Sequence, residues 1–274
     1  MNISSNSAGS ISEIASRFVA ARRQSRSIKE YPGTLPGNLD DAYRIQDQAI
    51  KLWPDEIGGW KVGLIGGQFR VQHGTDRLVG PIFNAAIRHN VSRAVNPVAV
   101  FDGGFGAVEA EFVFRIGVDT PVKKFEWTSA EAAEVVEGLY AGVEIASSPL
   151  AVINELGPTS IVSDFGNNNG LIVGARIDDW QRRLGTSLTC STMINGVRIG
   201  IGEPTSIPGG PVASLIFALC MCASRGFPLK AGQYVCTGAI TGVHQITKRQ
   251  HATICFDNID TLECEAIASG GAAN

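Results

Sequence analysis

The chain has 274 residues, of which 44% are hydrophobic and 18% charged, so it can bury a sizeable core and wholesale disorder is excluded. Its net charge is −3 and it has no run of Lys or Arg, so nucleic acid and anionic membrane are poor candidates for partners. No apolar run approaches the ~20 residues of a membrane-spanning helix.

The cysteines and the polar start of the chain indicate a reducing compartment. The six cysteines are scattered among mostly apolar residues and form no Cys-x-x-Cys pair, which is typical of buried free thiols. The first ten residues lack the apolar stretch of a secretory signal. We therefore expect a cytoplasmic protein.

The N-terminal part of the chain is predicted to be helical. Residues 1–9 are polar and are expected to form a disordered tail. Ser10 and Glu13 have the spacing of a capping box at the start of one amphipathic helix, and Asn38 can cap a second. We therefore predict a helical N-terminal region over residues 10–57.

The remainder, residues 58–274, consists of short apolar runs punctuated by glycine, which predicts a sheet-rich α+β domain rather than a doubly wound one. An Asn-Gly pair within residues 193–198 is a strong two-residue hairpin signal. One helix is expected from Thr128 through Leu139, and another begins at Pro211. The predicted strands are 60–64, 108–116, 143–146, 170–173, 234–236, 251–256 and 261–267.

Three glutamates lie in apolar, strand-like runs where burial is expected. Glu109 and Glu111 are two residues apart, so a strand directs both side chains to the same face, and Glu144 is similarly flanked by apolar residues. Buried anions repel and are costly to desolvate, and a hard divalent cation such as Mg²⁺ or Mn²⁺ suits an all-oxygen site. We hypothesise that the three hold a metal. A solvated face, or a pair neutralised by Lys and Arg, is the alternative for such a pattern.

Lys61 and Thr237-Gly238 are further candidates beside apolar strands. Lys61 lies inside a run that should be buried, where it could bind an anionic substrate or transfer a proton, although a lysine at a strand edge would look the same. Gly238 could offer a backbone N–H to a carboxylate, but a plain strand-ending turn explains Thr237 and Gly238 equally well. The polar turn 164–170 is most simply a loop.

Taken together, these segments resemble a known family. The segments 60–64, 108–112, 143–145, 164–174 and 229–241 occur in an order similar to that of the 2-keto-4-pentenoate hydratase branch of the fumarylacetoacetate hydrolase superfamily, from about Leu39 to the C-terminus. The resemblance implies a mixed β-sandwich roll with a helical N-terminal region. It also implies a homo-oligomer that acts on small 2-oxo acids or their enols.

The resemblance also assigns roles to residues. It implies Mg²⁺ or Mn²⁺ held by Glu109, Glu111 and Glu144, with Lys61 and Asp164 as catalytic residues. The substrate-binding residues that it implies are Lys61, Leu64, Gly66, Thr237 and Gly238.

The function implied is a hydratase that adds water to a 2-hydroxy-2,4-dienoate to give a 4-hydroxy-2-oxo acid in aromatic catabolism. The chain departs from the hydratase pattern at Gly66, Gly67, Leu78 and Phe165. Three alternatives therefore stay open: a decarboxylase of the oxalocrotonate type, a C–C hydrolase of acylpyruvate-like acids, and a non-catalytic member of the family. No Arg stands beside the motifs, which favours a substrate with one carboxylate over one with two.

Overall fold

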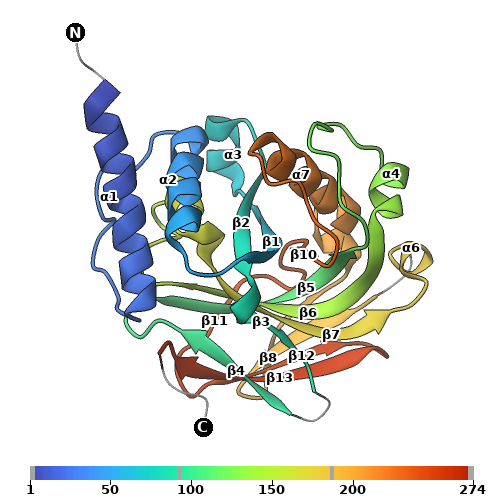
Figure 1. Cartoon of the computed structure of the whole chain (residues 1–274). Coiled ribbons are helices and arrows are strands. Elements are labelled where there is room, and N and C mark those ends of the chain that lie inside the picture. Colours follow the sequence, from blue (N-terminus) through green and yellow to red (C-terminus); the bar gives the residue numbers. More distant parts are fainter. Residues whose placement is uncertain (1–3, 92–93, 186–187, 271–274) are drawn as a thin grey trace.

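Two β-sheets form the body of the protein in the computed structural model, which describes residues 4–91, 94–185 and 188–270 (Figure 1). The larger sheet has eight strands, in the order β2-β1-β10-β5-β6-β7-β3, with β11 added beside β5. It comprises β1 (Ile57–Leu64), β2 (Arg77–Phe83), β3 (Ile87–His89), β5 (Phe105–Ile116), β6 (Val136–Ser148), β7 (Asn168–Ile177), β10 (Tyr234–Cys236) and β11 (His244–Gln245). The smaller, in the order β4-β13-β12-β8-β9, comprises β4 (Val95–Val100), β8 (Cys190–Ile194), β9 (Val197–Gly202), β12 (His251–Phe256) and β13 (Asp260–Ala268).

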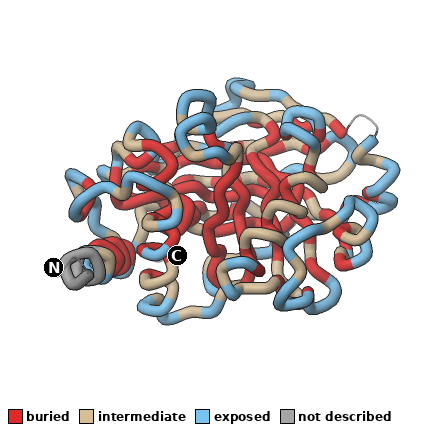
Figure 2. Tube along the Cα trace, turned by 90° about the horizontal axis from the view of Figure 1, so that it is seen from above, coloured by how far each residue is buried: buried red, intermediate tan, exposed pale blue. Residues whose placement is uncertain are grey.

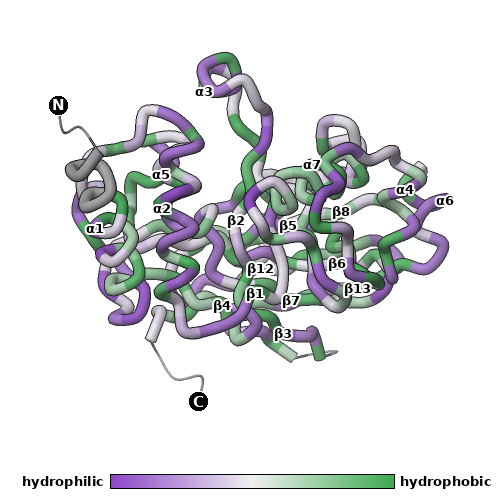
Figure 3. The backbone as a smooth tube through the Cα atoms, turned by 45° about the horizontal axis from the view of Figure 1, so that its top comes forward, coloured by the Kyte–Doolittle hydropathy of each residue, from purple (hydrophilic) through white to green (hydrophobic). Residues whose placement is uncertain are grey.

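Helices cover the larger sheet on the side away from the smaller one (Figure 1). The α-helices are α1 (Ser4–Arg23), α2 (Leu39–Leu52), α3 (Gly67–His73), α4 (Ser129–Glu134), α5 (Pro158–Ser163), α6 (Trp180–Arg183) and α7 (Gly210–Ser224). Short 3-10 helices are η1 (Asn84–Ala86), η2 (Phe165–Asn167) and η3 (Pro204–Ser206). Helix α1 contacts α2, which contacts α5, and α7 contacts β1 and β2. Helix α3 buries none of its residues and projects from the ends of β1 and β2 (Figure 3).

Strand β5 separates the main hydrophobic core from the face that carries the candidate site. Its alternate residues Val108, Ala110 and Phe112 belong to the main core, and the Phe112 ring packs edge-on against Phe256 of the smaller sheet, with ring centroids 5.9 Å apart. Because strand side chains alternate, Glu109, Glu111 and Val113 point the opposite way. Side chains on both faces of β5 are buried. Figure 2 shows that buried residues gather in the middle of the molecule.

Most of the predicted elements are present. The hairpin between β8 and β9 turns through Asn195 and Gly196, with φ angles of 49° and 78°, which are the positive values that a type I′ turn requires. Helix α7 carries Pro211 in its first turn. The six cysteines are all free, and four of them are fully buried. No helix among the described residues combines the length and apolar character needed to cross a membrane.

Several predicted strands are longer in the structure, and two helix boundaries differ from the prediction. The helix that Thr128 caps ends at Glu134 instead of continuing through Leu139, because β6 begins at Val136 and pairs with β5 on one side and β7 on the other. Ladder hydrogen bonds along both edges outweigh a local helical pattern. Helix α1 begins at Ser4, so residues 4–9, predicted to be disordered, lie in its first turns, since extending a formed helix costs little. Residues 1–3 of that predicted tail lie outside the described part of the chain.

Candidate metal centre

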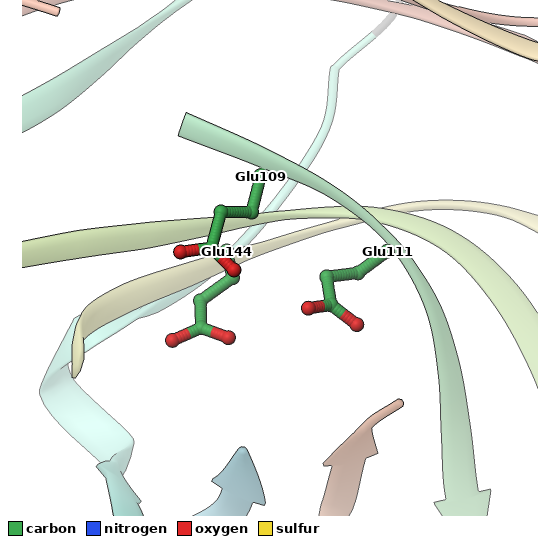
Figure 4. A group of neighbouring side chains, drawn as sticks. All are labelled: Glu109, Glu111 and Glu144. Carbon is green, nitrogen blue, oxygen red and sulfur yellow. The ribbon is translucent and has the colours of Figure 1, made fainter. Parts of the chain in front are cut away.

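Strand register brings the three glutamates together. Glu109 of β5 lies directly opposite Glu144 of β6, and Glu111 lies two residues further along the same face. Glu109 is 7% exposed, and Glu111 and Glu144 are fully buried. Figure 4 shows the three side chains converging below the two strands. One carboxylate oxygen from each can be chosen so that all lie within 4.8 Å of one another. The sequence placed these acids in buried strands, and the structure brings them to one point.

Few donors satisfy this cluster of acids. The Lys61 Nζ lies 2.8 Å from Glu144 Oε1, which also accepts a hydrogen bond from the Asn168 amide at 3.1 Å. The Gly238 backbone N–H donates to Glu111 Oε2 at 2.6 Å. The remaining oxygens of these two acids, Glu111 Oε1 and Glu144 Oε2, are buried and have no hydrogen-bond partner. Three carboxylates therefore face one ammonium group, and two oxygens lack any donor.

These residues fit a hard divalent cation. Carboxylate oxygens are the ligands that Mg²⁺ and Mn²⁺ prefer, and buried oxygens without donors are costly unless something positive meets them. Lys61 offsets one of the three negative charges, so it does not replace a cation. Neutralisation by Lys and Arg, the alternative to a metal, therefore accounts for only one of the three charges, through Lys61.

Burial and mutual repulsion favour the neutral forms of two of these acids. Burial first, and then the charge of Glu144, raise the pKa of Glu109 to about 7, although Lys61 acts in the opposite direction. Burial, and then the neighbouring carboxylates, raise the pKa of Glu111 well above its ordinary value. Burial alone would lower the pKa of Lys61, but the nearby carboxylates, Glu144 first, outweigh it and hold the pKa above its usual value. Lys61 is therefore an ammonium group at neutral pH.

These shifts predict a pH dependence in EDTA. A carboxyl with a raised folded-state pKa favours folding below its unfolded pKa near 4.5, and this contribution is lost as the pH rises through about 7 for Glu109. The free energy of unfolding of the wild type minus that of Glu109→Gln should therefore decrease between pH 5 and pH 8, as measured by thermal unfolding. If the difference grows as the pH rises, Glu109 is not strained in its charged form. Excess Mg²⁺ should oppose the fall, because a cation binds the deprotonated acids.

A pocket of about 300 Å³ opens beside the acids. Lys61 and Leu64, two of the predicted substrate-binding residues, line it together with Glu109. Lys61 is 5% exposed, as its place inside β1 predicts. The other residues that line the pocket are Gly63, Leu78, Asn154, Ile161, Gly166, Asn167, Ala239, Gly242 and Val243. Among the residues that the structure describes, Lys61 is the only basic one in this lining, which is otherwise largely apolar.

Three other residues predicted to bind substrate do not line the pocket. Gly66 stands at the start of α3, which projects away from the body. Thr237 is fully buried, and its hydroxyl donates to the Phe112 carbonyl at 2.8 Å. The Gly238 N–H does meet a carboxylate, but that carboxylate belongs to Glu111. Thr237 therefore binds the backbone of β5 beside Glu111, and Gly238 binds the Glu111 carboxylate itself.

Asp164, predicted to be catalytic, is fully buried in an ion pair and is not among the residues that line the pocket. Its two carboxylate oxygens accept hydrogen bonds from Arg22 Nε at 2.5 Å and Nη2 at 2.9 Å, and the Ser148 hydroxyl donates to it at 2.6 Å. The Arg22 guanidinium also donates to the carbonyl oxygens of Ser147 and Asn168. Asp164 thus has its partners within the protein, and it anchors the start of the turn 165–167.

Arg22→Met should destabilise the protein by about 3–5 kcal/mol, because it leaves the Asp164 carboxylate buried without a charged partner. The double variant Arg22→Met, Asp164→Asn should recover much of that loss, since the orphaned charge is then gone. Urea unfolding of the wild type, both single variants and the double variant measures the coupling. Additive losses would show that the pair carries no interaction of its own.

Sequence reasoning missed Arg22, Ser148 and Asn168. Arg22 lies 142 residues from Asp164, and nothing in the helical stripe around it marks it as buried. Ser148 follows directly on the apolar run that contains Glu144, and no local motif marks its hydroxyl as a partner of Asp164. Three successive asparagines at 167–169 signalled positive φ or side-chain capping, and Asn168 does support Glu144.

The two sheets and the similar solved structures described next define the fold as the fumarylacetoacetate hydrolase-like α+β fold. This fold confirms the predicted mixed β-sandwich roll. The chain is similar to 4-oxalocrotonate decarboxylase from Pseudomonas putida G7 complexed with magnesium and adipate, with a TM-score of 0.78 at 18% identity over 95% of this chain and 98% of that one. The same decarboxylase complexed with calcium and acetate gives a TM-score of 0.76 at 18% identity and the same coverage.

A more distant likeness is to fumarylpyruvate hydrolase from Pseudomonas aeruginosa in complex with Mn²⁺ and pyruvate. Its TM-score is 0.56 at 16% identity, over 79% of this chain and 91% of that one. No protein-family model and no curated protein matches the sequence. At these identities the likenesses establish the fold.

Proposed function

We propose that the chain is a divalent-metal-dependent lyase of 2-oxo acids, and specifically a hydratase that converts a 2-hydroxy-2,4-dienoate into a 4-hydroxy-2-oxo acid. The observation that carries the proposal is the group of three buried glutamates with two unpartnered oxygens beside a pocket that Lys61 lines. The magnesium, calcium and manganese in the complexes of the similar structures support a divalent metal as the cofactor.

Glu109, Glu111 and Glu144 would hold the cation. When bound, Mg²⁺ or Mn²⁺ would act as a Lewis acid that draws electron density from the 2-oxo group of the substrate. The charge balance supports this assignment, because three carboxylates and Lys61 leave two negative charges that a dication neutralises.

Lys61 would bind the substrate carboxylate and transfer protons to the substrate. Its side chain lines the pocket, so its ammonium form can attract the substrate carboxylate and donate a proton. In the proposed reaction the dienol gains a proton at C5 and loses its enol proton, which gives a 2-oxo-3-enoate. Water then adds across C3 and C4, with its hydroxyl at C4 and a proton at C3.

The pocket lining favours a monoacid. Within the described part of the chain, Lys61 is the only basic residue that lines it, and Leu78, Ile161 and Val243 offer apolar surface for a short carbon tail. A second carboxylate would be desolvated there without a charged partner, which costs several kcal/mol. A hydratase of a monoacid therefore suits this lining better than an enzyme for a diacid.

A decarboxylase of an oxalocrotonate-like acid is the second candidate. It is favoured by the extent of the structural likeness, which covers 95% of this chain and includes 98% of the decarboxylase from P. putida G7, against 79% for the comparison with fumarylpyruvate hydrolase. The C–C hydrolase is less favoured by that comparison.

Turnover of a monoacid and a diacid separates these candidates. 2-Hydroxypenta-2,4-dienoate and 4-oxalocrotonate are each incubated with the protein, with Mg²⁺ and with EDTA. We expect metal-dependent loss of the dienoate chromophore, with 4-hydroxy-2-oxopentanoate as the product by NMR.

Each other outcome has a distinct meaning. Release of CO₂ from the diacid without hydration of the monoacid would replace the hydratase with the decarboxylase. If the folded protein consumes neither compound in either condition, the lyase proposal fails, and a non-catalytic role for the fold takes its place.

We also propose that the protein is a homo-oligomer. Strand β9 lies at the edge of the smaller sheet, and its alternate residues Val197, Ile199 and Ile201 are exposed, the first and last by 65% and 64%. Natural edge strands with apolar side chains are usually covered. Light scattering should give a mass that is a multiple of 29.0 kDa, and a monomeric mass at assay concentration would contradict the proposal.

A further inference from the structure

The two carboxylate oxygens of Glu144 differ in what they bind. Oε1 lies 2.8 Å from Lys61 Nζ and accepts a second hydrogen bond, at 3.1 Å, from the side-chain amide of Asn168. Each oxygen of a carboxylate offers about two lone pairs, so these two donors use the hydrogen-bonding capacity of Oε1 in full. Oε2 is buried and has no hydrogen-bond partner. The oxygen of Glu144 that remains for a cation is therefore Oε2.

Glu111 shows the same division between its two oxygens. Its Oε2 accepts a hydrogen bond from the Gly238 backbone N–H at 2.6 Å, while Oε1 is buried and has no partner. Glu111 and Glu144, the two fully buried acids, thus each have one oxygen bound by the protein and one without a donor. This arrangement favours ligation of a cation through a single oxygen of each acid.

The amide of Asn168 is held so that its NH₂ group meets Glu144. The Gly170 backbone N–H donates to Asn168 Oδ1 at 3.1 Å, which makes Oδ1 the acceptor end of the amide and Nδ2 its donor end. Nδ2 also donates to the Gly170 carbonyl oxygen at 3.3 Å. Asn168 is 4% exposed, and both ends of its amide are bound. The side chain therefore donates to Glu144 from a fixed position.

A β-bulge brings Asn168 to this position. The pairing of β6 with β7 skips Asn169, which is the extra residue of the bulge, and bulges re-aim the side chains beside them. The next residue, Gly170, has a φ of 150°, and a Cβ there would lie 2.9 Å from the Ala86 carbonyl oxygen, so this position requires glycine. Arg22 Nη1 donates to the Asn168 carbonyl oxygen at 2.9 Å, which ties helix α1 to the bulge.

We propose that Asn168 is a positioning residue that limits Glu144 to one cation-binding oxygen, and that it thereby shifts the preference of the centre from Ca²⁺ toward Mg²⁺. This inference rests on the proposed function, in which Glu144 is a metal ligand. Ca²⁺ accepts both oxygens of one carboxylate in a flexible shell, whereas Mg²⁺ demands near-ideal octahedral geometry. Without the Asn168 donor, Oε1 would regain a lone pair, and Glu144 could bind Ca²⁺ through both of its oxygens.

The test measures binding of the cation alone and does not require turnover. Calorimetry gives the affinities for Mg²⁺ and for Ca²⁺ in wild type and in Asn168→Ser, whose hydroxyl can still accept the Gly170 N–H but lacks the atom that donates to Glu144. The Mg²⁺ affinity should fall about 10–100-fold, the usual cost of losing a partner of a metal ligand. The Ca²⁺ affinity should fall less or rise, so the ratio of Mg²⁺ to Ca²⁺ affinity should fall about tenfold.

Asn169→Ser is the matched control for this change. It makes the same substitution in the same bulge, at a side chain whose amide donates to the Ala99 carbonyl oxygen instead. Both cation affinities should equal those of wild type. A second variant, Asn168→Asp, serves if Asn168→Ser does not fold: its carboxylate can accept the Gly170 N–H but cannot donate to Glu144, so it should lower the ratio as well. Thermal unfolding in EDTA shows that each variant is folded.

The outcomes separate this inference from the proposed function. If the folded Asn168 variant keeps the wild-type ratio of affinities, Asn168 does not govern the choice of cation, and the inference is overturned while the metal centre stands. An equal change of the ratio in Asn169→Ser would assign the effect to the bulge and would also overturn it. If wild type binds neither Mg²⁺ nor Ca²⁺, the inference and the metal-dependent function fail together.

Discussion

Glu111→Gln should weaken binding of Mg²⁺ or Mn²⁺ at least ~100-fold while leaving the fold intact. The change removes one of three charged ligands, and even residues that only support a metal ligand affect affinity by 10–100-fold. The fold should survive because glutamine has the same shape and its carbonyl oxygen can still accept the hydrogen bond that Gly238 donates to Glu111. Calorimetric titration with Mn²⁺ measures the loss.

Thermal unfolding in EDTA provides a second measure of the same change. Without a cation, the wild-type glutamates repel one another, so Glu111→Gln should unfold at the same temperature as wild type or higher. With excess Mn²⁺, the wild type should gain more stability than Glu111→Gln, because a ligand that binds only the folded state stabilises it in proportion to the logarithm of its affinity.

Glu137→Gln is the matched control, since Glu137 lies on the surface end of β6 and pairs with Arg115. Its cation affinity should equal that of wild type. Retained affinity in Glu111→Gln would contradict the assignment of Glu111 as a ligand.

Lys61→Met should lower turnover by about 10²–10⁴-fold without weakening metal binding. Loss of a positioned proton donor has a cost of this size, and loss of the ammonium removes positive charge from beside the cation. Methionine keeps an unbranched stem under the turn 165–167, so the pocket wall should keep its shape. The measurements are the rate of dienoate consumption at saturating Mg²⁺ and the affinity for Mn²⁺.

Lys230→Met makes the same chemical change at an exposed lysine paired with Asp119, and should alter neither quantity. Equal rates for Lys61→Met and wild type would make Lys61 a structural partner of Glu144 alone. A parallel loss of metal affinity would place its effect in the metal centre rather than in proton transfer.

Much of the fold could be predicted from the sequence, because many elements are determined by residues that are neighbours in the chain. The Asn195-Gly196 turn, Pro211 at the start of α7 and the alternation along β5 each depend on neighbouring residues. Where a distant partner decides the structure, the local pattern was insufficient. The capping box at Thr128 is real, yet the helix ends at Glu134, because the following residues pair with two strands that sequence alone does not place beside them.

The candidate site divides in the same way. Burial of the glutamates and of Lys61 followed from apolar flanks, but the pairing of Glu109 with Glu144 depends on strand register. The ion pair of Asp164 could not be predicted, because its partner, Arg22, belongs to the first helix. No role was predicted for Asn167, since its place in the pocket lining depends on a left-handed turn that packs against Gly80 of another strand.

The pairing of Glu109 with Glu144 also bears on how the chain finds its structure. A slip of one residue between β5 and β6 would turn one partner's carboxylate toward the apolar interior and disperse the cluster. A chain with misaligned strands would then bind no cation, so ions present during refolding would stabilise only molecules with the correct alignment. The same three acids would thus also favour the correct register of β5 and β6 during folding in the presence of the cation.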